Sequence, residues 1–210
     1  MGIPEKSAGV TKRIAVLISG RGSHLKNLID CCARGDIRAN VGVVISNKSD
    51  APGLQFARDA GLESVILSHK QYPSREEYDE ELVRIINDRK ADLVCLAGFM
   101  RLLSPVLIRA FPLRIMNVHP SLLPAFPGLH AQRQAVEYGV KVTGVTVHFV
   151  DEGLDSGPII LQNIIEVKPS DTEETLSERL LPLEHKTYAE AVRLFCENRI
   201  KVEGRTVTLL

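Results

Sequence analysis

The amino-acid sequence predicts an α/β fold whose core is a mainly parallel, twisted sheet. Over residues 13–119, short apolar runs typical of buried strands alternate with helical patterns. Strands that alternate with helices require crossover connections, which place successive strands parallel in one sheet. After residue 140, two apolar runs follow one another with no helical pattern between them. We therefore expect antiparallel strands added to the sheet in the C-terminal part.

Five apolar runs account for the predicted parallel strands. They are rich in Val, Ile and Leu, as strands buried on both faces are, and most are bounded by polar residues or glycine. The runs cover residues 13–19, 41–47, 64–67, 91–98 and 113–119.

Helical patterns lie between these runs. Helices over residues 23–35 and 51–61 each end on a glycine, the residue that most readily adopts the left-handed conformation of a helix end. Ser74 and Glu77 form a capping box that opens a third helix. This helix presents apolar residues at the spacing of a buried face.

Residues 142–150 and 157–167 are the two strands that we expect to be antiparallel. Asp171 and Glu174 predict the cap of a long last helix. Pro182 lies inside this helix and should kink or break it, because proline lacks the N–H group that the helix needs. The last ten residues predict a hairpin. The complete pattern is Rossmann-like.

The composition excludes several classes of partner. The 26 Lys and Arg residues balance 26 Asp and Glu residues without a basic block, so we expect no nucleic-acid partner. No apolar run approaches the roughly 18 residues of a membrane span, so we expect no membrane partner. Residues 1–12 lack a hydrophobic signal region, and we expect a loose tail before a single domain of residues 13–210 in a cytoplasmic protein. The sequence leaves open a monomer or a homodimer.

The four cysteines form neither a C-x-x-C pair nor a zinc-ligand spacing. In a chain with this much apolar sequence, buried thiols are expected rather than a disulfide framework. The sequence therefore predicts no metal site.

A glycine-containing turn, ISGRGSHL, joins the first predicted strand to the first helix. The N–H groups at a helix N-terminus bind phosphate well. Gly20 and Gly22 fit a dinucleotide-binding turn, but Leu25 holds the position of the third glycine, and the second strand does not end in an acid that could bind a ribose. We therefore expect a single phosphate rather than a nicotinamide dinucleotide. A tight turn that only needs small residues is the alternative.

Asn117 and His119 end the fifth predicted strand, just before a proline-containing loop. Side chains alternate along a strand, so these two share one face with their Cα atoms about 6.6 Å apart. An amide donor beside an imidazole suits a developing oxyanion and a proton transfer. Open α/β sheets bind their ligands at such carboxyl ends of strands. We therefore prefer a catalytic pair to a structural histidine.

The acidic segment DEGLDSG, residues 151–157, follows the sixth predicted strand. A carboxylate of this segment beside His119 would favour the imidazolium form and raise the pKa of His119 from about 6.5. An acidic turn between antiparallel strands is the alternative. His148 alternates with Thr146 along the preceding strand, and we expect His148 to line the same cleft.

Five segments carry a resemblance to a known family: VLISGRGSHL, LAGFMRLLSP, MNVHPSLLPAFPGLH, TGVTVHFVDEGLDSGPIILQ and LSERLLPLEHKTY. Together they resemble the phosphoribosylglycinamide formyltransferases, also called glycinamide ribonucleotide transformylases. The resemblance runs from about residue 12 to residue 200, in the family's order and spacing. The Asn-x-His-Pro-Ser-x-Leu-Pro core is shared with other enzymes of 10-formyltetrahydrofolate. The chain length and the glycine turn narrow the resemblance to this family.

The resemblance implies a reaction of purine (IMP) biosynthesis, in which the formyl group of 10-formyltetrahydrofolate passes to the amine of glycinamide ribonucleotide. The folate is then a co-substrate, and neither a tightly bound cofactor nor a metal is implied. Asn117 and His119 match the pair that holds the tetrahedral oxyanion. Asp155 matches the carboxylate that keeps His119 protonated and helps to move the proton from the amine to the folate nitrogen.

The resemblance also implies binding positions. Gly22, Ser23 and His24 match the phosphate-binding turn, and Glu184 matches the acid that holds the nucleotide. The implied folate-binding positions are Arg75, Met100, Arg101, Leu102, Leu103, Asn117, Asp151 and Asp155. The chain departs from the family at two positions. His24 stands where Asn is usual, and Pro182, two residues before Glu184, could change the orientation of the Glu184 side chain.

Four other functions are less favoured. A formyltetrahydrofolate deformylase carries an N-terminal regulatory domain, and the few residues before the first predicted strand leave no room for one. A methionyl-tRNA formyltransferase needs a C-terminal tRNA-binding domain and a basic surface. An inactive folate- or nucleotide-binding module would not need the full set of catalytic residue types. A nicotinamide dehydrogenase conflicts with the incomplete glycine pattern.

Overall fold

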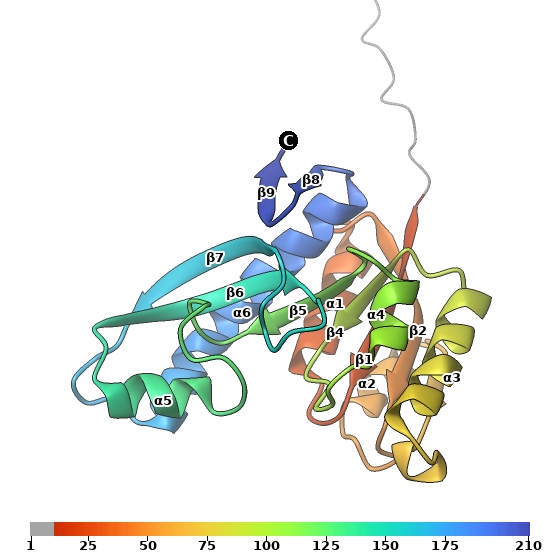
Figure 1. Ribbon diagram of the computed structural model, residues 1–210, viewed down its shortest axis with the longest axis horizontal. Helices are drawn as coiled ribbons and strands as arrows, with labels where there is room; N and C mark the ends of the chain where they lie inside the picture. The colour runs from red at the N-terminus through yellow and green to blue at the C-terminus, as the bar shows by residue number, and fades with distance from the viewer. Residues whose placement is uncertain (1–10) are drawn as a thin grey trace, which may run out of the picture.

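A sheet of seven strands forms the centre of the computed structural model, which describes residues 11–210 (Figure 1). Its strands are β1 (Lys12–Ile18), β2 (Ala39–Ser46), β3 (Ser64–Ile66), β4 (Leu93–Leu96), β5 (Ile115–His119), β6 (Val142–Phe149) and β7 (Ile159–Glu166). They lie in the order β3-β2-β1-β4-β5-β6-β7. The first five are parallel, whereas β6 is antiparallel to β5 and β7 to β6. The predicted Rossmann-like sheet with antiparallel strands in its C-terminal part is confirmed.

Helices cover both faces of this sheet. They are α1 (Ser23–Arg34), α2 (Leu54–Asp59), α3 (Arg75–Asp88), α4 (Pro105–Ala110), α5 (Ala131–Tyr138) and α6 (Glu173–Cys196), with a 3-10 turn, η1, at His69–Gln71 and a hairpin of β8 (Ile200–Glu203) and β9 (Thr206–Leu209). One core cluster joins α1, α2 and α6 to the sheet, and a second joins α3 and α4 to its other face. A third, smaller cluster joins α5 and the first half of α6 to β6.

The apolar run of β1 shows why the sequence specifies a central strand. Ile14, Val16 and Ile18 point into the first core cluster, whereas Ala15 and Leu17 point into the second. All five are fully buried. A strand covered by helices on both faces needs apolar side chains at every position, which is the continuous pattern that the sequence shows.

Two helix starts differ from the predictions. Ser74 caps α3 by accepting a hydrogen bond from the N–H group of Glu77, but the Glu77 carboxylate contacts the Ser74 hydroxyl rather than the Ser74 N–H that a full capping box requires. The cap of α6 is Thr172 with Thr175, not Asp171 with Glu174. Threonine at both positions satisfies the two N–H groups reciprocally, one residue later than predicted.

Helix α4 was not predicted, because six residues are too short to show a helical period. The available signal was the pair Ser104 and Pro105, since proline at the first helical position is favoured.

The expectation that Pro182 breaks the last helix is wrong. α6 runs from Glu173 to Cys196 without interruption. Because proline lacks an N–H group, Pro182 removes one helical hydrogen bond. A proline inside a helix costs about 3 kcal/mol. The helix compensates by burying several large side chains on the sheet, including Leu180 and Tyr188. Pro182 itself is exposed, so its ring displaces no core residue.

The two ends of the chain were predicted to be a loose tail and a hairpin. Residues 1–10 of the predicted tail lie outside the described part, and Lys12 already belongs to β1, where it pairs with Ala39. At the other end, Glu203 pairs with Thr206, so the hairpin is present and turns at residues 204–205. Within residues 11–210, no helix has both the length and the apolar character required to cross a bilayer.

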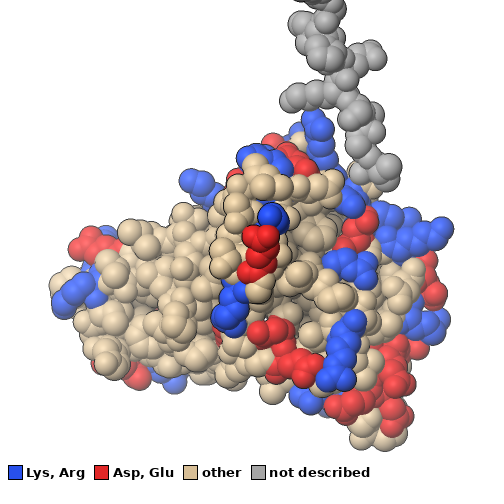
Figure 2. Space-filling view, turned by 45° about the horizontal axis from the view of Figure 1, so that its top comes forward, with Lys and Arg blue, Asp and Glu red and all other residues tan. Residues whose placement is uncertain are grey.

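All four cysteines are free thiols, three of them buried. Burial raises the pKa of Cys196 to about 12, so that thiol is un-ionised at neutral pH. On the face seen in Figure 2, acidic and basic side chains are intermixed, and they gather mostly on the side of α3.

The strand order places a topological switch point between β1 and β4, where open α/β sheets form a ligand crevice. From β1 the chain moves outward through β2 to β3, then crosses back to β4 on the other side of β1. Ligands bind at this kind of switch point, outside the carboxyl ends of the strands. The β1–α1 turn lies on one side of it, and the segment after β4 lies on the other. β5 is the next strand along, so its carboxyl end borders the same crevice.

Candidate active site

The carboxyl end of β5 carries the predicted pair of residues. Asn117 pairs with Leu96 of β4 on one side and with His148 of β6 on the other, and His119 pairs with Thr146. His119 is only 4% exposed, whereas Asn117 is partly exposed. The strand end therefore holds the imidazole inside the protein and leaves the amide closer to solvent.

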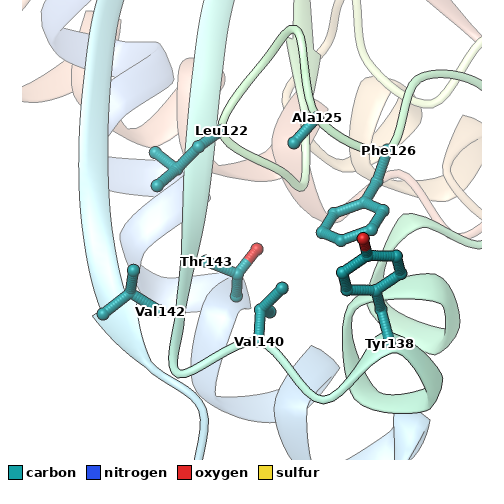
Figure 3. A pocket seen from close by; sticks show the side chains of 7 residues that line it. All are labelled: Leu122, Ala125, Phe126, Tyr138, Val140, Val142 and Thr143. Atoms are coloured by element: carbon teal, nitrogen blue, oxygen red, sulfur yellow. The ribbon is translucent and has the colours of Figure 1, made fainter.

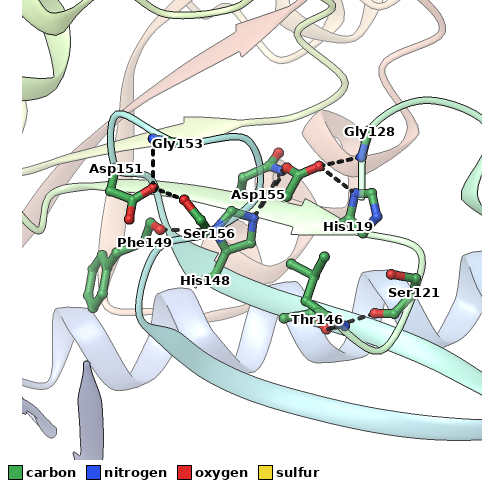
Figure 4. A network of polar contacts seen from close by, with 12 residues as sticks. His119, Ser121, Gly128, Thr146, His148, Phe149, Asp151, Gly153, Asp155 and Ser156 are labelled. Carbon is green, nitrogen blue, oxygen red and sulfur yellow. Dashed lines mark hydrogen bonds and ion pairs between the residues drawn. The ribbon is translucent and has the colours of Figure 1, made fainter. Parts of the chain in front are cut away.

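Asp155 lies beside both members of this pair, and Figure 4 shows its contacts with His119 and with the Gly128 N–H group. Its Oδ2 is 3.4 Å from His119 Nδ1 and accepts a 2.8 Å hydrogen bond from the N–H group of Gly128. Its Oδ1 is 3.5 Å from Asn117 Nδ2 and 3.7 Å from His148 Nε2. Asp155 has a positive φ of 47°, which aims its side chain back toward the strand end. The structure thus brings together Asn117, His119 and Asp155, which stand up to 38 residues apart in the sequence.

The two ring nitrogens of His119 have different partners. Nε2 lies 2.8 Å from the carbonyl oxygen of Phe126, which can only accept a hydrogen bond, so Nε2 carries a proton. Nδ1 is then the nitrogen that gains or loses a proton, and it faces Asp155. When His119 is protonated, both of its N–H groups have an acceptor.

Burial lowers the pKa of His119 below its usual value, against the opposing effects of the Phe126 carbonyl and Asp155. The expectation of a raised pKa is therefore wrong for the net shift, although Asp155 acts in the predicted direction. The sequence indicated the neighbouring carboxylate but not the depth at which the ring is buried. His119 is neutral at rest near pH 7 and is held ready to accept a proton on Nδ1.

The pKa of Asp155 is lowered even though burial acts to raise it. Contacts with His148, with the N–H group of Gly128 and with His119 together outweigh the effect of burial. Asp155 is therefore ionised at neutral pH. It provides a fixed negative charge beside Nδ1 of His119.

His148 fixes the amide of Asn117. Its Nδ1 lies 2.9 Å from the carbonyl oxygen of Phe149, which can only accept a hydrogen bond, so Nδ1 carries a proton; in the tautomer protonated there alone, Nε2 is an acceptor. Its Nε2 can then accept from Asn117 Nδ2 at 3.3 Å. This contact orients the amide, whose second N–H group has only the long 3.5 Å contact to Asp155 Oδ1 and is the group that can donate to an oxyanion. His148, which we expected to line the same cleft, is buried beside Asn117 and Asp155.

A buried hydroxyl anchors the loop of residues 120–128 that supplies the Phe126 carbonyl and the Gly128 N–H group. Thr146 Oγ1 donates to the carbonyl of Ser121 (2.7 Å) and accepts from the N–H group of Leu123 (3.0 Å) and from Gln162 Nε2 (2.9 Å). Gln162 also donates to the carbonyl of Leu123. These roles were not predicted, because backbone groups and their anchors leave no distinctive residue pattern in the sequence.

The glycine turn leaves the start of α1 available to an anion. Gly22 precedes α1 in the left-handed conformation (φ 75°), and no side chain caps the first N–H groups of the helix. Gly53 buttresses the turn: its N–H donates to Gly20, and a Cβ atom on Gly53 would lie 2.8 Å from Gly22 Cα. The predicted phosphate turn therefore needs a third, distant glycine that the local motif does not include.

Glu184 is buried on α6 and lies next to this turn. Its Oε2 is 2.9 Å from His24 Nε2, and the two side chains are only 10% and 12% exposed. One turn further along α6, the hydroxyl of Tyr188 lies 3.0 Å from the carbonyl oxygens of Leu96, the last residue of β4, and of Met116, the second residue of β5. The negative charge of Glu184 also acts to raise the pKa of His119.

The predicted folate-binding positions differ in their surroundings. Met100 and Leu102 are 66% and 65% exposed, which is unusual for such apolar side chains, whereas Leu103 packs against the second core cluster. The guanidinium of Arg101 lies over the ring of Tyr78 at 5.0 Å. Arg75 contacts Glu76 at the surface. The segment of residues 97–103 is tied to the end of β1, because the Met100 N–H donates to Ser19.

Asp151 organises its own loop. Its Oδ1 accepts from the Gly153 N–H (3.1 Å) and from the Ser156 hydroxyl (2.6 Å), as Figure 4 shows. These contacts shape the turn that presents Asp155. The structure brings Asp151 into the same segment as Asp155, but none of its hydrogen bonds or ion pairs within residues 11–210 joins it to His119 or Asn117.

Two hollows lie beside the site rather than in it. The first, of about 340 Å³, is lined by Leu122, Ala125, Phe126, Tyr138, Val140, Val142 and Thr143 (Figure 3). Phe126 belongs to both places, since its ring lines this hollow and its carbonyl contacts His119. The second, of about 500 Å³, lies between α1 and α6. We place the chemistry at the β5 end, because the convergent polar groups are there.

Within residues 11–210, no group of three or more His, Cys, Asp or Glu side chains is arranged to hold a metal ion. The groups that converge at the β5 end are an amide donor, a buried imidazole and an ionised carboxylate. This set can stabilise an oxyanion and move a proton.

Comparisons with known proteins agree with this chemistry. Residues 12–192 match the family model described as formyl transferase. The phosphoribosylglycinamide formyltransferase of Escherichia coli K12 is 45% identical over 93% of this chain and 92% of its own length. The trifunctional purine biosynthetic protein adenosine-3 of Drosophila melanogaster is 50% identical over 87% of this chain, which spans only 14% of that relative.

A solved structure shows the same architecture. The crystal structure of glycinamide ribonucleotide transformylase 1 from Symbiobacterium toebii superimposes with a TM-score of 0.94, at 52% identity, over 96% of this chain and 95% of that one. The family match covers most of the sequence, including every residue of the site described above. The chain therefore belongs to the formyl transferase family.

Proposed function

We propose that this chain transfers the formyl group of 10-formyltetrahydrofolate to the amine of glycinamide ribonucleotide, giving formylglycinamide ribonucleotide and tetrahydrofolate in purine biosynthesis. The observation that carries the proposal is the contact of Asp155 with His119 and Asn117 at the end of β5, beside the glycine turn and Glu184. The names of the bacterial relatives and of the similar solved structure support the same substrate pair.

The first step is attack of the amine on the formyl carbon, which places a negative charge on the formyl oxygen. Asn117 provides an N–H donor for this oxyanion, held in place by His148. A fixed donor is worth more than water here, because it needs no reorganisation as the charge develops.

The proton then moves through Nδ1 of His119. The attacking nitrogen becomes acidic in the tetrahedral adduct, and Nδ1 accepts its proton. The resulting imidazolium is stabilised by Asp155 and by the Phe126 carbonyl, and its positive charge also stabilises the nearby oxyanion. When the bond between the formyl carbon and the folate nitrogen breaks, the same proton passes to that nitrogen.

The two substrates occupy different sides of the crevice in this proposal. The phosphate of the nucleotide lies at the N-terminus of α1, beside Gly22, Ser23 and His24. Glu184 accepts hydrogen bonds from N–H or O–H groups elsewhere in the nucleotide. The flat face of the folate ring contacts the exposed side chains of Met100 and Leu102. The guanidinium groups of Arg75 and Arg101 are available to the carboxylates of the folate. The loop that carries Asp151 and Asp155 covers the folate ring. All these side chains come from one copy of the chain.

One assay separates this function from its rivals. Purified protein is mixed with 10-formyltetrahydrofolate with and without glycinamide ribonucleotide, and the release of tetrahydrofolate is followed. We expect release that depends on the nucleotide and yields one formylated nucleotide per folate. Release at the same rate without the nucleotide would instead indicate a deformylase. No release under either condition would indicate a binding module.

A further inference from the structure

His24 and Glu184 form a buried ion-pair contact between the glycine turn and α6. The contact of 2.9 Å joins the second residue of α1 to a residue 160 positions later, and both side chains are almost inaccessible. A second pair of the same kind, His130 with Glu173, lies at the N-terminal end of α6, but there the histidine side chain is 59% exposed. Exposed pairs contribute little to the position of their side chains, whereas a buried pair fixes both partners.

This contact is the polar interaction that orients both side chains. Within residues 11–210, His24 is the only ion-pair partner of Glu184, and His24 Nδ1 is buried without a hydrogen-bond partner. The rings of His185 and Tyr188 pack edge-on against His24 at 5.0 and 6.0 Å. The imidazole therefore has little freedom, and its Nε2 stays directed at the carboxylate.

The backbone that carries Glu184 is fixed independently. Tyr188 ties α6 to β4 and β5 through the carbonyls of Leu96 and Met116, and Asn27 of α1 donates to the carbonyl of His185 at 2.9 Å. These contacts set where α6 lies, but they do not touch the carboxylate of Glu184. The orientation of that carboxylate depends on His24.

We propose that His24 is a positioning residue for the nucleotide, holding the Glu184 carboxylate where it accepts from the N–H or O–H groups of the substrate while the neighbouring backbone binds the phosphate. This inference rests on the proposed function and deepens it. It also gives a role to the histidine that replaces the asparagine usual at this position. The imidazole acts through Glu184 rather than on the phosphate, because its Nε2 is already engaged.

The test is a comparison of His24→Leu with His24→Gln in steady-state kinetics. Leucine fills the space but cannot contact the carboxylate, whereas the amide nitrogen of glutamine stands as many bonds from Cβ as Nε2 does. A hydrogen bond to a charged group contributes enough to change affinity by about 10-fold or more. We expect His24→Leu to raise KM for glycinamide ribonucleotide about 10-fold or more, with KM for the folate and kcat within about twofold of wild type. His24→Gln should recover most of this loss.

A double-variant comparison shows whether His24 acts through Glu184. Glu184→Gln alone should raise the same KM, and His24→Leu combined with Glu184→Gln should raise it no further than the larger single effect, because both remove one interaction. Glu173→Gln and His130→Asn break the exposed pair on the same helix and should leave KM unchanged. If His24→Leu does not fold by circular dichroism, His24→Ser carries the same expectation.

The outcomes separate this inference from the function on which it rests. A wild-type KM for the nucleotide in His24→Leu, with an active wild-type enzyme, would overturn the role of His24 and leave the proposed function standing. Equal losses in His24→Leu and His24→Gln, or additive effects with Glu184→Gln, would also overturn it. Wild-type protein without nucleotide-dependent turnover would overturn both.

Discussion

The chemistry of single residues in this site depends on backbone groups as much as on side chains. The Phe126 carbonyl decides which nitrogen of His119 carries the permanent proton, and the Gly128 N–H helps to keep Asp155 ionised. A side chain that is buried this deeply would otherwise lose much of its ability to hold a charge. The residues that the sequence identifies most clearly therefore function only because of neighbouring backbone groups that no sequence pattern identifies.

Removing either member of the strand-end pair should slow the reaction without unfolding the protein. His119→Ala removes the proton-transfer group and should lower kcat by about 10²–10⁴. Asn117→Ala removes an oxyanion donor and should lower kcat by about 10²–10³. Single-turnover rates measure these losses, with circular dichroism to verify the fold. Near-normal turnover in either variant would contradict the role assigned to that residue.

Asp155→Asn should lower the pKa of His119 further. The carboxylate is one of the groups that raise this pKa against the effect of burial, so its neutralisation leaves burial less opposed. In an NMR titration, the imidazole of His119 should lose its proton below pH 6.5 in the wild type and at lower pH still in Asp155→Asn. Asp151→Asn, in the same loop but without contact to His119, is the matched control. An identical midpoint in the wild type and Asp155→Asn would mean that Asp155 does not act on the ring.

At the scale of elements, the site joins a strand end to two irregular segments, and the sheet holds both. β6 supplies Thr146, which anchors residues 121–123, and its far end leads into the turn that presents Asp155. β7 supplies Gln162 to the same anchor. The antiparallel strands therefore extend the sheet and also position the loop that contacts His119.

Replacing Thr146 by valine should test this anchor. Valine keeps the shape but leaves the Leu123 N–H and the Ser121 carbonyl without their partner, and each buried unsatisfied group costs about 1–3 kcal/mol. We expect a loss of about 2–4 kcal/mol in the free energy of unfolding, measured by urea denaturation, together with a lower kcat. Thr146→Ser keeps the hydroxyl and should lose clearly less. Equal stability of the valine and serine variants would show that the hydroxyl is not the anchor.

At the scale of the whole molecule, burial lowers the pKa of three histidines: His69, His119 and His185. Each binds its proton less readily in the folded chain than in the unfolded chain. Their protonation therefore favours unfolding as the pH falls through the unfolded value of about 6.5. Carboxyl groups with a lowered pKa, such as Asp155, contribute only at lower pH, as the pH falls below about 4.

Stability should accordingly fall between about pH 7.5 and pH 6. The unfolded state binds more protons than the folded state in this window, so the free energy of unfolding rises with pH. Urea midpoints at the two pH values measure the effect, and His119→Gln should show a smaller difference than the wild type because one of the three groups is gone. A wild-type midpoint that is higher at pH 6 would contradict the sign.

Much of the fold could be predicted because it follows from local pattern. The continuous apolar run of β1 and the glycine that ends α1 depend on neighbouring residues alone. The errors arose where tertiary contacts compete with local preference. Pro182 is tolerated because α6 is held on the sheet at Tyr188, and the cap of α6 lies at Thr172 because a second threonine satisfies it reciprocally.

The sequence by itself determined the order of strands and helices and the residue types at the catalytic strand end, because periodicity and motif spacing are properties of the chain. Only the tertiary structure decided that Asp155 meets His119, that burial outweighs this carboxylate in setting the pKa of the ring, and that His24 contacts Glu184. These are distances and burial between segments far apart in the chain. They arise only when the sheet brings the strand ends together, and no local pattern encodes them.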